Sequence, residues 1–125
     1  MKMNKSNCEK AEMLVEVLPY VNRFRDKIIV IKYGGNAMIN EDLKKAVMQD
    51  LLLIKSVGMH PILVHGGGPA INDMLKKLKV ESHFEQGLRV TDKETMEIVE
   101  MVLAGKVNKD IVGTLNQIGG KGIGL

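Results

Sequence analysis

The sequence predicts an α/β fold with a mainly parallel central sheet. Two short apolar segments, residues 28–33 and 61–65, have the composition of strands, and glycines and then a helical pattern follow each of them. An order of strand, helix, strand, helix requires crossover connections, which join parallel strands with a right-handed path. The 125 residues suit one domain.

The composition excludes several classes of protein. It is 45% hydrophobic and 26% charged, as in soluble globular proteins, and aromatic residues make up only 3%. A basic stripe and aromatic residues for stacking are both lacking, so we expect no nucleic-acid partner. The longest apolar runs are shorter than a membrane span, and residues 1–10 are polar, so we expect a cytoplasmic protein with no membrane partner.

The residues before the first strand predict a helical arm over 8–24. Its apolar stripe has helical spacing and consists of Ala11, Leu14, Val15 and Leu18. Pro19 predicts a kink, because it removes a backbone hydrogen bond and clashes with the preceding turn. We therefore divide the chain into an arm, 1–27, which is free to pack on another subunit, and a lobe, 28–125.

The first strand–helix unit begins at Ile28 and ends its strand at Gly34-Gly35. Asn40 is a good N-cap, and Gly58 ends the helix that follows. The predicted apolar face of this helix consists of Leu43, Val47, Leu51 and Ile54.

The second unit has its strand over 61–65, three glycines over 66–68, and Pro69 at the first helical position. Its helix presents one apolar face, made of Ile71, Met74, Leu75 and Leu78.

The rest of the chain predicts an extended segment over 83–90 and two further helices. Thr91 to Glu94 match a capping box that starts the first helix, and Gly105 separates it from the second. Gly119-Gly120 ends that second helix. The last residues, 122–125, are typical of the start of a third central strand.

The glycines at 66–68 give the strongest chemical signal, because they follow a strand and open a helix. Glycine exposes backbone N–H groups, and a helix N-terminus adds positive potential, which favours a carboxylate or phosphate. The alternative is a tight turn without a ligand. The P-loop pattern is absent, and Ile71 stands where the dinucleotide fingerprint requires glycine.

Two cationic residues stand near these turns. Lys32 lies at the carboxyl end of the first strand, where ligands bind in α/β sheets, and is suited to stabilise a transferring phosphoryl group; the alternative is a lysine that reaches solvent. Arg89 is suited to hold a carboxylate with two hydrogen bonds, and the alternative is a surface ion pair. The three histidines lack metal-ligand spacing, so we expect no protein-bound metal.

Three segments together resemble the amino-acid kinase family. They are IVIKYGGNAM at 29–38, ILVHGGGPAIN at 62–72, and GLRVTDKETMEIVEMVLAGKVNKDIV at 87–112. The resemblance implies a three-layer αβα sandwich of the carbamate kinase-like type, here truncated to the N-terminal, substrate-binding lobe. The third segment is most similar to members of the family that phosphorylate N-acetyl-L-glutamate in arginine biosynthesis.

The resemblance also implies roles for individual residues. Lys32 would stabilise the phosphoryl group in transfer, Gly67 and Gly68 would offer backbone N–H groups to N-acetyl-L-glutamate, and Arg89 would hold its α-carboxylate. Gly34 and Gly35 would lie near the phosphates of ATP. The product would be N-acetylglutamyl 5-phosphate, with Mg²⁺ carried by the nucleotide.

The resemblance further implies a homo-oligomer: a dimer, or a hexamer built through the arm, with arginine as a feedback inhibitor. Family members are more than twice as long, so we expect the 125 residues alone to be inactive. Alternatives are other members of the family (glutamate 5-kinase, carbamate kinase, aspartokinase) or a non-catalytic module that binds a metabolite or dimerises.

Overall fold

The computed structural model describes residues 6–125, apart from the side chain of Asn36; residues 1–5 of the predicted arm lie outside the described residues. Strands β1 (Ile28–Tyr33) and β2 (His60–His65) pair in parallel, in a register that joins Ile28 to His60 and Tyr33 to His65. The predicted α/β class and the parallel pairing are confirmed.

The sheet buries only one of its faces. Ile31, Tyr33 and Leu63 point to the helices and belong to the core or pack against it. The alternate residues point the other way and are 49–66% exposed: Ile28, Val30, Ile62 and Val64. This face stays open among the described residues, because no second helical layer covers it there.

Helix α3 (Glu41–Ser56) connects the two strands and packs on β2. The side chain of Asn40 accepts hydrogen bonds from the first-turn N–H groups at 2.9 and 3.0 Å, so the predicted N-cap is confirmed. The buried face differs from the prediction, because it contains Lys44, Met48 and Leu51 and leaves Leu43 exposed. A one-turn helix before α3, α2 (Asn36–Ile39), was not predicted from the sequence.

Helix α4 (Gly68–Leu78) follows β2 with Pro69 in its first turn, as predicted. The extended segment after it is an antiparallel hairpin of β3 (His83–Glu85) and β4 (Leu88–Val90). Its two turn residues, Gln86 and Gly87, both have positive φ, as a type I′ turn requires.

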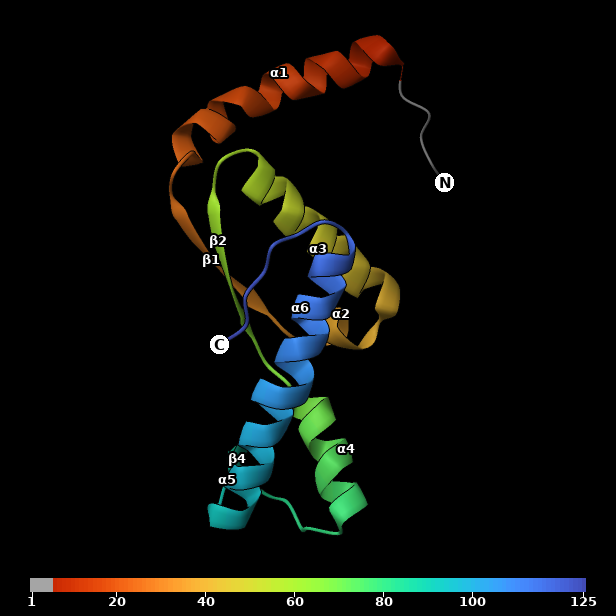
Figure 1. Cartoon of the computed structure of the whole chain (residues 1–125), viewed down its shortest axis with the longest axis vertical. Coiled ribbons are helices and arrows are strands. Elements are labelled where there is room, and N and C mark those ends of the chain that lie inside the picture. Colours follow the sequence, from red (N-terminus) through yellow and green to blue (C-terminus); the bar gives the residue numbers. More distant parts are fainter. Residues whose placement is uncertain (1–5) are drawn as a thin grey trace.

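The last helices form one unbroken rod, which we call the C-terminal rod. It runs through α5 (Lys93–Glu100), the π-helix η1 (Met101–Val107) and α6 (Asn108–Gln117) (Figure 1). The predicted break at Gly105 is wrong, because the wider π turn accommodates this glycine within the rod. Residues 122–125 form no strand.

The core lies where the sheet, α3, α4 and the C-terminal rod meet. It consists of Tyr33, Met48, Leu51, Ile71, Leu75, Ile98, Val102, Val107 and Ile111. Helix α1 (Asn7–Phe24) lies at the far end of the molecule from α4 and α5, buries none of its residues, and continues through Pro19 (Figure 1).

Candidate functional site

The parallel register brings two glycine segments to the same edge of the sheet. Gly34-Gly35 follows β1, and the turn at residues 66–68, which we call the glycine turn, follows β2. The N–H of Gly66 donates to the carbonyl of Tyr33 at 3.0 Å, so the two segments are joined directly.

Lys32 stands one residue before the end of β1 and pairs in register with Val64. It belongs to the alternate residues of the open face, and its side chain is exposed. Within residues 6–125 its ammonium group has no hydrogen bond or ion pair, so its charge is free to act on a ligand. The structure thus places this charge beside the glycine edge, on the uncovered side of the sheet.

The two glycine segments differ in what their backbone requires. Gly35 has a φ of +63°, a conformation that residues with a Cβ rarely adopt. Its carbonyl accepts from the N–H of Met38 at 3.1 Å and so starts the short helix α2. A Cβ at Gly34 would meet no atom within 4 Å, so the space beside it is open.

The glycine turn forms the N-terminus of α4 without a side-chain cap. A Cβ at Gly68 would meet nothing within 4 Å, which leaves its backbone open to a ligand. Gly67 is buried, and a Cβ there would lie 2.5 Å from a methyl carbon of Leu103. The two residues predicted to bind substrate therefore have different surroundings: Gly68 faces open space, and Gly67 faces the C-terminal rod.

Arg89 is half-buried and held from three sides. Its guanidinium donates to the hydroxyl of Ser82 and to the side-chain oxygen of Asn72, and it stacks on the Phe84 ring at 4.7 Å from the ring centre. Asn72 lies four residues after Gly68, about one turn along α4. The hairpin thus brings Arg89 to the side of α4, about one turn after the glycine turn.

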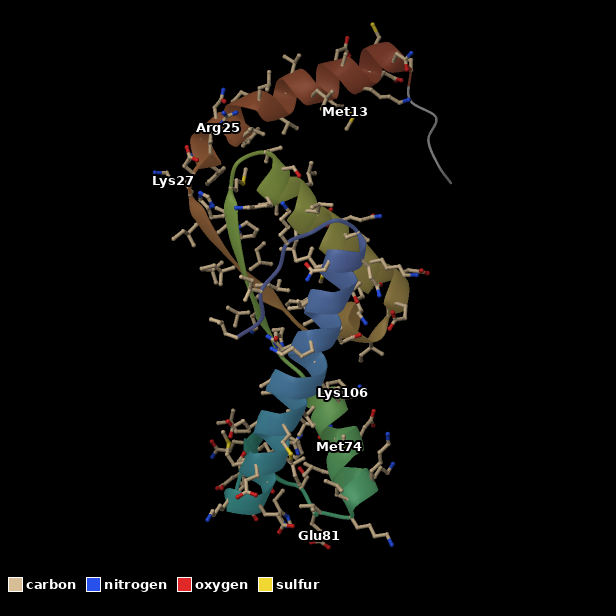
Figure 2. The ribbon with its side chains drawn as sticks, in the orientation of Figure 1. Met13, Arg25, Lys27, Met74, Glu81 and Lys106 are labelled. Atoms are coloured by element: carbon tan, nitrogen blue, oxygen red, sulfur yellow. The ribbon has the colours of Figure 1, made fainter. Side chains whose placement is uncertain are left out.

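A small cavity of about 210 Å³ lies on the inner side of the glycine turn. It is lined by Tyr33, Gly67, Lys106 and the Lys44–Asp110 ion pair, among others. Figure 2 shows Lys106 where the C-terminal rod passes the first turn of α4. The hydrogen bond to Asp110 raises the pKa of Lys44, and burial raises the pKa of Tyr33.

A much larger cavity, of about 1070 Å³, lies between β2, α6 and the last residues of the chain. Its walls are mostly apolar and include Leu63, Ile111 and Leu115. It contains none of the predicted site residues.

The sequence patterns did not identify the residues that hold the candidate site residues in position. Asn72, Ser82 and Phe84 orient Arg89, and Leu103 limits the space at Gly67. Asn72 and Leu103 lie inside segments that carried the family resemblance. Ser82 and Phe84 have no local signal, because their importance depends on which elements the fold brings together.

Residues 6–125 contain no metal-binding cluster: no group of three or more histidine, cysteine, aspartate or glutamate side chains in this range is arranged to hold a metal ion. None of the helices in the same range has the length and apolar character needed to cross a membrane.

Known proteins match this chain both in sequence and in fold. A family profile described as the amino acid kinase family matches residues 27–125. The acetylglutamate kinase of Heliobacterium modesticaldum is 62% identical over 117 residues, which are 94% of this chain and 40% of that protein. The chain therefore spans about 40% of the length of the curated relatives it matches.

Solved structures resemble the fold as well. A protein from Streptococcus mutans UA159 matches with a TM-score of 0.64 and 35% identity, over 74% of this chain and 37% of that one. The N-acetylglutamate synthase of Neisseria gonorrhoeae, solved with coenzyme A and N-acetyl-glutamate, matches with a TM-score of 0.70 and 22% identity over 92% of this chain and 26% of that one. This second likeness shows the fold alone.

Proposed function

The chain belongs to the amino acid kinase family, and on this premise we propose that it binds N-acetyl-L-glutamate for ATP-dependent phosphorylation of the side-chain carboxylate. The product is N-acetylglutamyl 5-phosphate, and Mg²⁺ arrives with the nucleotide. The high identity to acetylglutamate kinases supports this substrate over those of other members of the family.

The observation that carries the proposal is the position of Arg89 beside Asn72 of α4, about one turn after Gly68. Its contacts with Ser82, Asn72 and Phe84 hold the guanidinium in one orientation, so little side-chain freedom is lost when a ligand binds. Each terminal nitrogen of the fork has a second N–H, and these suit the two oxygens of an α-carboxylate. The open N–H groups at Gly68 and the start of α4 suit a second anionic or polar group of the same ligand.

The reaction brings two anions together, and the chain supplies positive charge to oppose their repulsion. Phosphoryl transfer needs positioning and electrostatic stabilisation and no enzyme nucleophile. We assign Lys32 to the charge that develops on the phosphoryl group, because its ammonium is free on the open face beside the glycine edge. Gly34 and Gly35 leave room for the phosphates of ATP to approach the backbone.

A binding titration tests the proposal. N-acetyl-L-glutamate and plain glutamate are titrated into the 125-residue chain by calorimetry, for the wild type and Arg89→Ala. We expect the acetylated ligand to bind more tightly, and Arg89→Ala to weaken it by roughly 1.5–3 kcal/mol because a charged hydrogen-bonding group is lost. Arg23→Ala is the matched control, since Arg23 also stacks on a phenylalanine, Phe24, but lies on α1.

Other results would contradict this assignment. Equal or stronger binding of plain glutamate would favour a member of the family that acts on the free amino acid, such as glutamate 5-kinase. Binding unchanged in Arg89→Ala would remove Arg89 from the substrate site. Binding of neither ligand would overturn the proposal for this chain.

We further assign α1 to assembly and regulation, as an arm that joins dimers into a larger ring under the control of arginine. Its exposed apolar side chains support this, since the helix buries none of its residues within the described chain: they include Leu14, Val15, Leu18 and Tyr20. Deleting residues 1–24 from a protein that contains this chain and the remaining length of its relatives should reduce the assembly to dimers and abolish arginine inhibition. Sedimentation velocity with and without arginine checks both outcomes.

A further inference from the structure

The C-terminal rod approaches the end of β2 and the glycine turn that follows it. Atom Nδ2 of Asn108, the residue after η1, lies 3.4 Å from Nε2 of His65, the last residue of β2. Two residues farther along the chain, a Cβ at Gly67 would lie 2.5 Å from Cδ2 of Leu103 and 3.4 Å from Cγ2 of Val107. The rod therefore packs on the glycine turn itself as well as on the strand before it.

The three atoms nearest to a Cβ at Gly67 all belong to the π segment. The N–H of Asn108 donates to the carbonyl of Leu103, five residues earlier, which is the bonding pattern of a π turn. Leu103 and Val107 both belong to this wide turn, and the side chains of both lie next to Gly67. Val107 is buried in the core, so its position is fixed by packing on several sides.

The need for glycine at position 67 follows from this packing. Its φ of 178° lies outside the left-handed region, so no left-handed conformation accounts for a glycine here. The contact with Leu103 constrains this position instead, because a Cβ at Gly67 would lie 2.5 Å from Cδ2 of Leu103 and would force that side chain to shift. Gly68 is different, since a Cβ there would meet nothing within 4 Å.

We propose that Leu103 of the π-helix is a positioning residue for the glycine turn. It sets the distance between the rod and Gly67, and so holds the N–H groups of Gly67 and Gly68 in the orientation that receives the ligand. The inference rests on the proposed function for its ligand, N-acetyl-L-glutamate, and its packing claim is tested separately below.

A double-substitution experiment on the 125-residue chain tests the binding part. Gly67→Ala should weaken N-acetyl-L-glutamate binding about tenfold, a size within the coupling measured between contacting residues. Leu103→Val removes the methyl that the new Cβ meets, so Gly67→Ala with Leu103→Val should regain most of the lost affinity. Gly68→Ala is the control: any loss that it causes should not be regained with Leu103→Val, because Gly68 does not face the rod.

Two binding results would overturn the proposal. A Gly67→Ala chain that stays as weak with Leu103→Val as without it would mean that Gly67 is needed for ligand contact alone. A Gly67→Ala chain that binds as well as the wild type would mean that Leu103 imposes no limit.

A measurement without ligand keeps the inference separate from the proposed function. In amide-resolved NMR spectra, Leu103→Val should shift the signals of Gly67 and Gly68, and Met101→Val, an exposed change in the same π-helix, should not. This comparison also applies if Gly67→Ala does not fold. If no wild-type binding is seen, the proposed function fails, while shifts confined to Leu103→Val still support the positioning role and their absence overturns it.

Discussion

The ammonium nitrogen of Lys44 lies 2.6 Å from a carboxylate oxygen of Asp110, and this ion pair joins α3 to α6 across 66 positions of sequence. The Lys44 side chain is only 10% exposed, whereas that of Asp110 is 58% exposed. Glu41 lies farther from the same ammonium, at 3.6 Å, and is 71% exposed. The buried lysine thus depends mainly on one carboxylate for its compensation.

We predict that Asp110→Asn lowers the free energy of unfolding by about 1–2 kcal/mol. Removing one partner of a fully buried pair costs about 3–5 kcal/mol, and solvent around Asp110 reduces this figure. Glu41→Gln, the matched change on the same lysine, should cost less than about 0.5 kcal/mol. Urea denaturation of the two variants checks the difference, and equal losses would contradict the dominant role of Asp110.

Alkaline pH should destabilise the fold through two groups. The hydrogen bond from Lys44 to Asp110 raises the pKa of Lys44 above its ordinary 10.5, so its stabilisation is complete below that pH and is lost as pH rises through the folded value. Burial raises the pKa of Tyr33 above 10.0, so the unfolded state releases this proton first and gains stability. Both effects lower the free energy of unfolding above about pH 10.

An absorbance titration isolates the tyrosine part of this prediction. The chain has two tyrosines, so Tyr20→Phe leaves Tyr33 as the only phenol. We expect its tyrosinate signal to appear above the ordinary pKa of 10.0, and to return toward it in denaturant. A signal at the ordinary value in the folded chain would show that Tyr33 is not shielded from water.

The start of α5 should depend on Asp92 and not on Thr91. A carboxylate oxygen of Asp92 accepts from the N–H of Thr95 at 2.8 Å, and this bond lowers the pKa of Asp92. Asp92→Ala should therefore lower the melting temperature, and its contribution should fade in the wild type as acid protonates the carboxyl below its usual 3.8. Thr91→Ala is the control, because the Thr91 hydroxyl donates to the carbonyl of Arg89 instead.

Calorimetric melting of both variants decides between the two caps. A larger decrease in melting temperature for Thr91→Ala than for Asp92→Ala would support the capping box at Thr91 that the sequence pattern predicts.

Lys32→Ala should lower turnover by roughly 10²–10³, by analogy with the loss of a single group that stabilises transition-state charge. The test uses a chimera in which this chain replaces the matching segment of the Heliobacterium modesticaldum relative, which is 62% identical to it. Acyl phosphate is trapped with hydroxylamine, and Lys55→Ala on α3 is the control. Full turnover in Lys32→Ala would remove this residue from the mechanism.

Sequence patterns predicted the elements whose signals are local. The strand at 28–33, the N-cap at Asn40 and the stop at Gly58 are set by residues within a few positions, and the structure confirms them. Parallel pairing also followed, because a helix between two strands leaves few other topologies. The candidate site residues were chosen from the same kind of local signal, since both glycine segments follow strands, and their roles stay predictions.

Features that depend on distant partners were not predictable. Nothing in the local pattern indicates that Lys44 is buried, and it is buried because Asp110 reaches it from another helix. Gly105 was read as the end of a helix, but packing on α4 keeps the rod continuous through a π turn. The contacts that orient Arg89 come from α4 and from residues at the hairpin. No local sequence pattern indicates that these two segments are in contact.

The π-helix also sets the phase of everything after it. Each residue of an α-helix turns the next by about 100°, so a wide turn shifts the direction in which α6 points its side chains. The wide turn closes over one residue more than an α turn, so deleting one residue, for example Ala104, would let the segment return to ordinary α geometry with α6 in nearly the same phase. Inserting one residue has no such outlet and would rotate Asp110 by about 100° away from Lys44. Length at this point of the chain is therefore constrained in one direction, and single-residue insertions there should be tolerated far less than deletions.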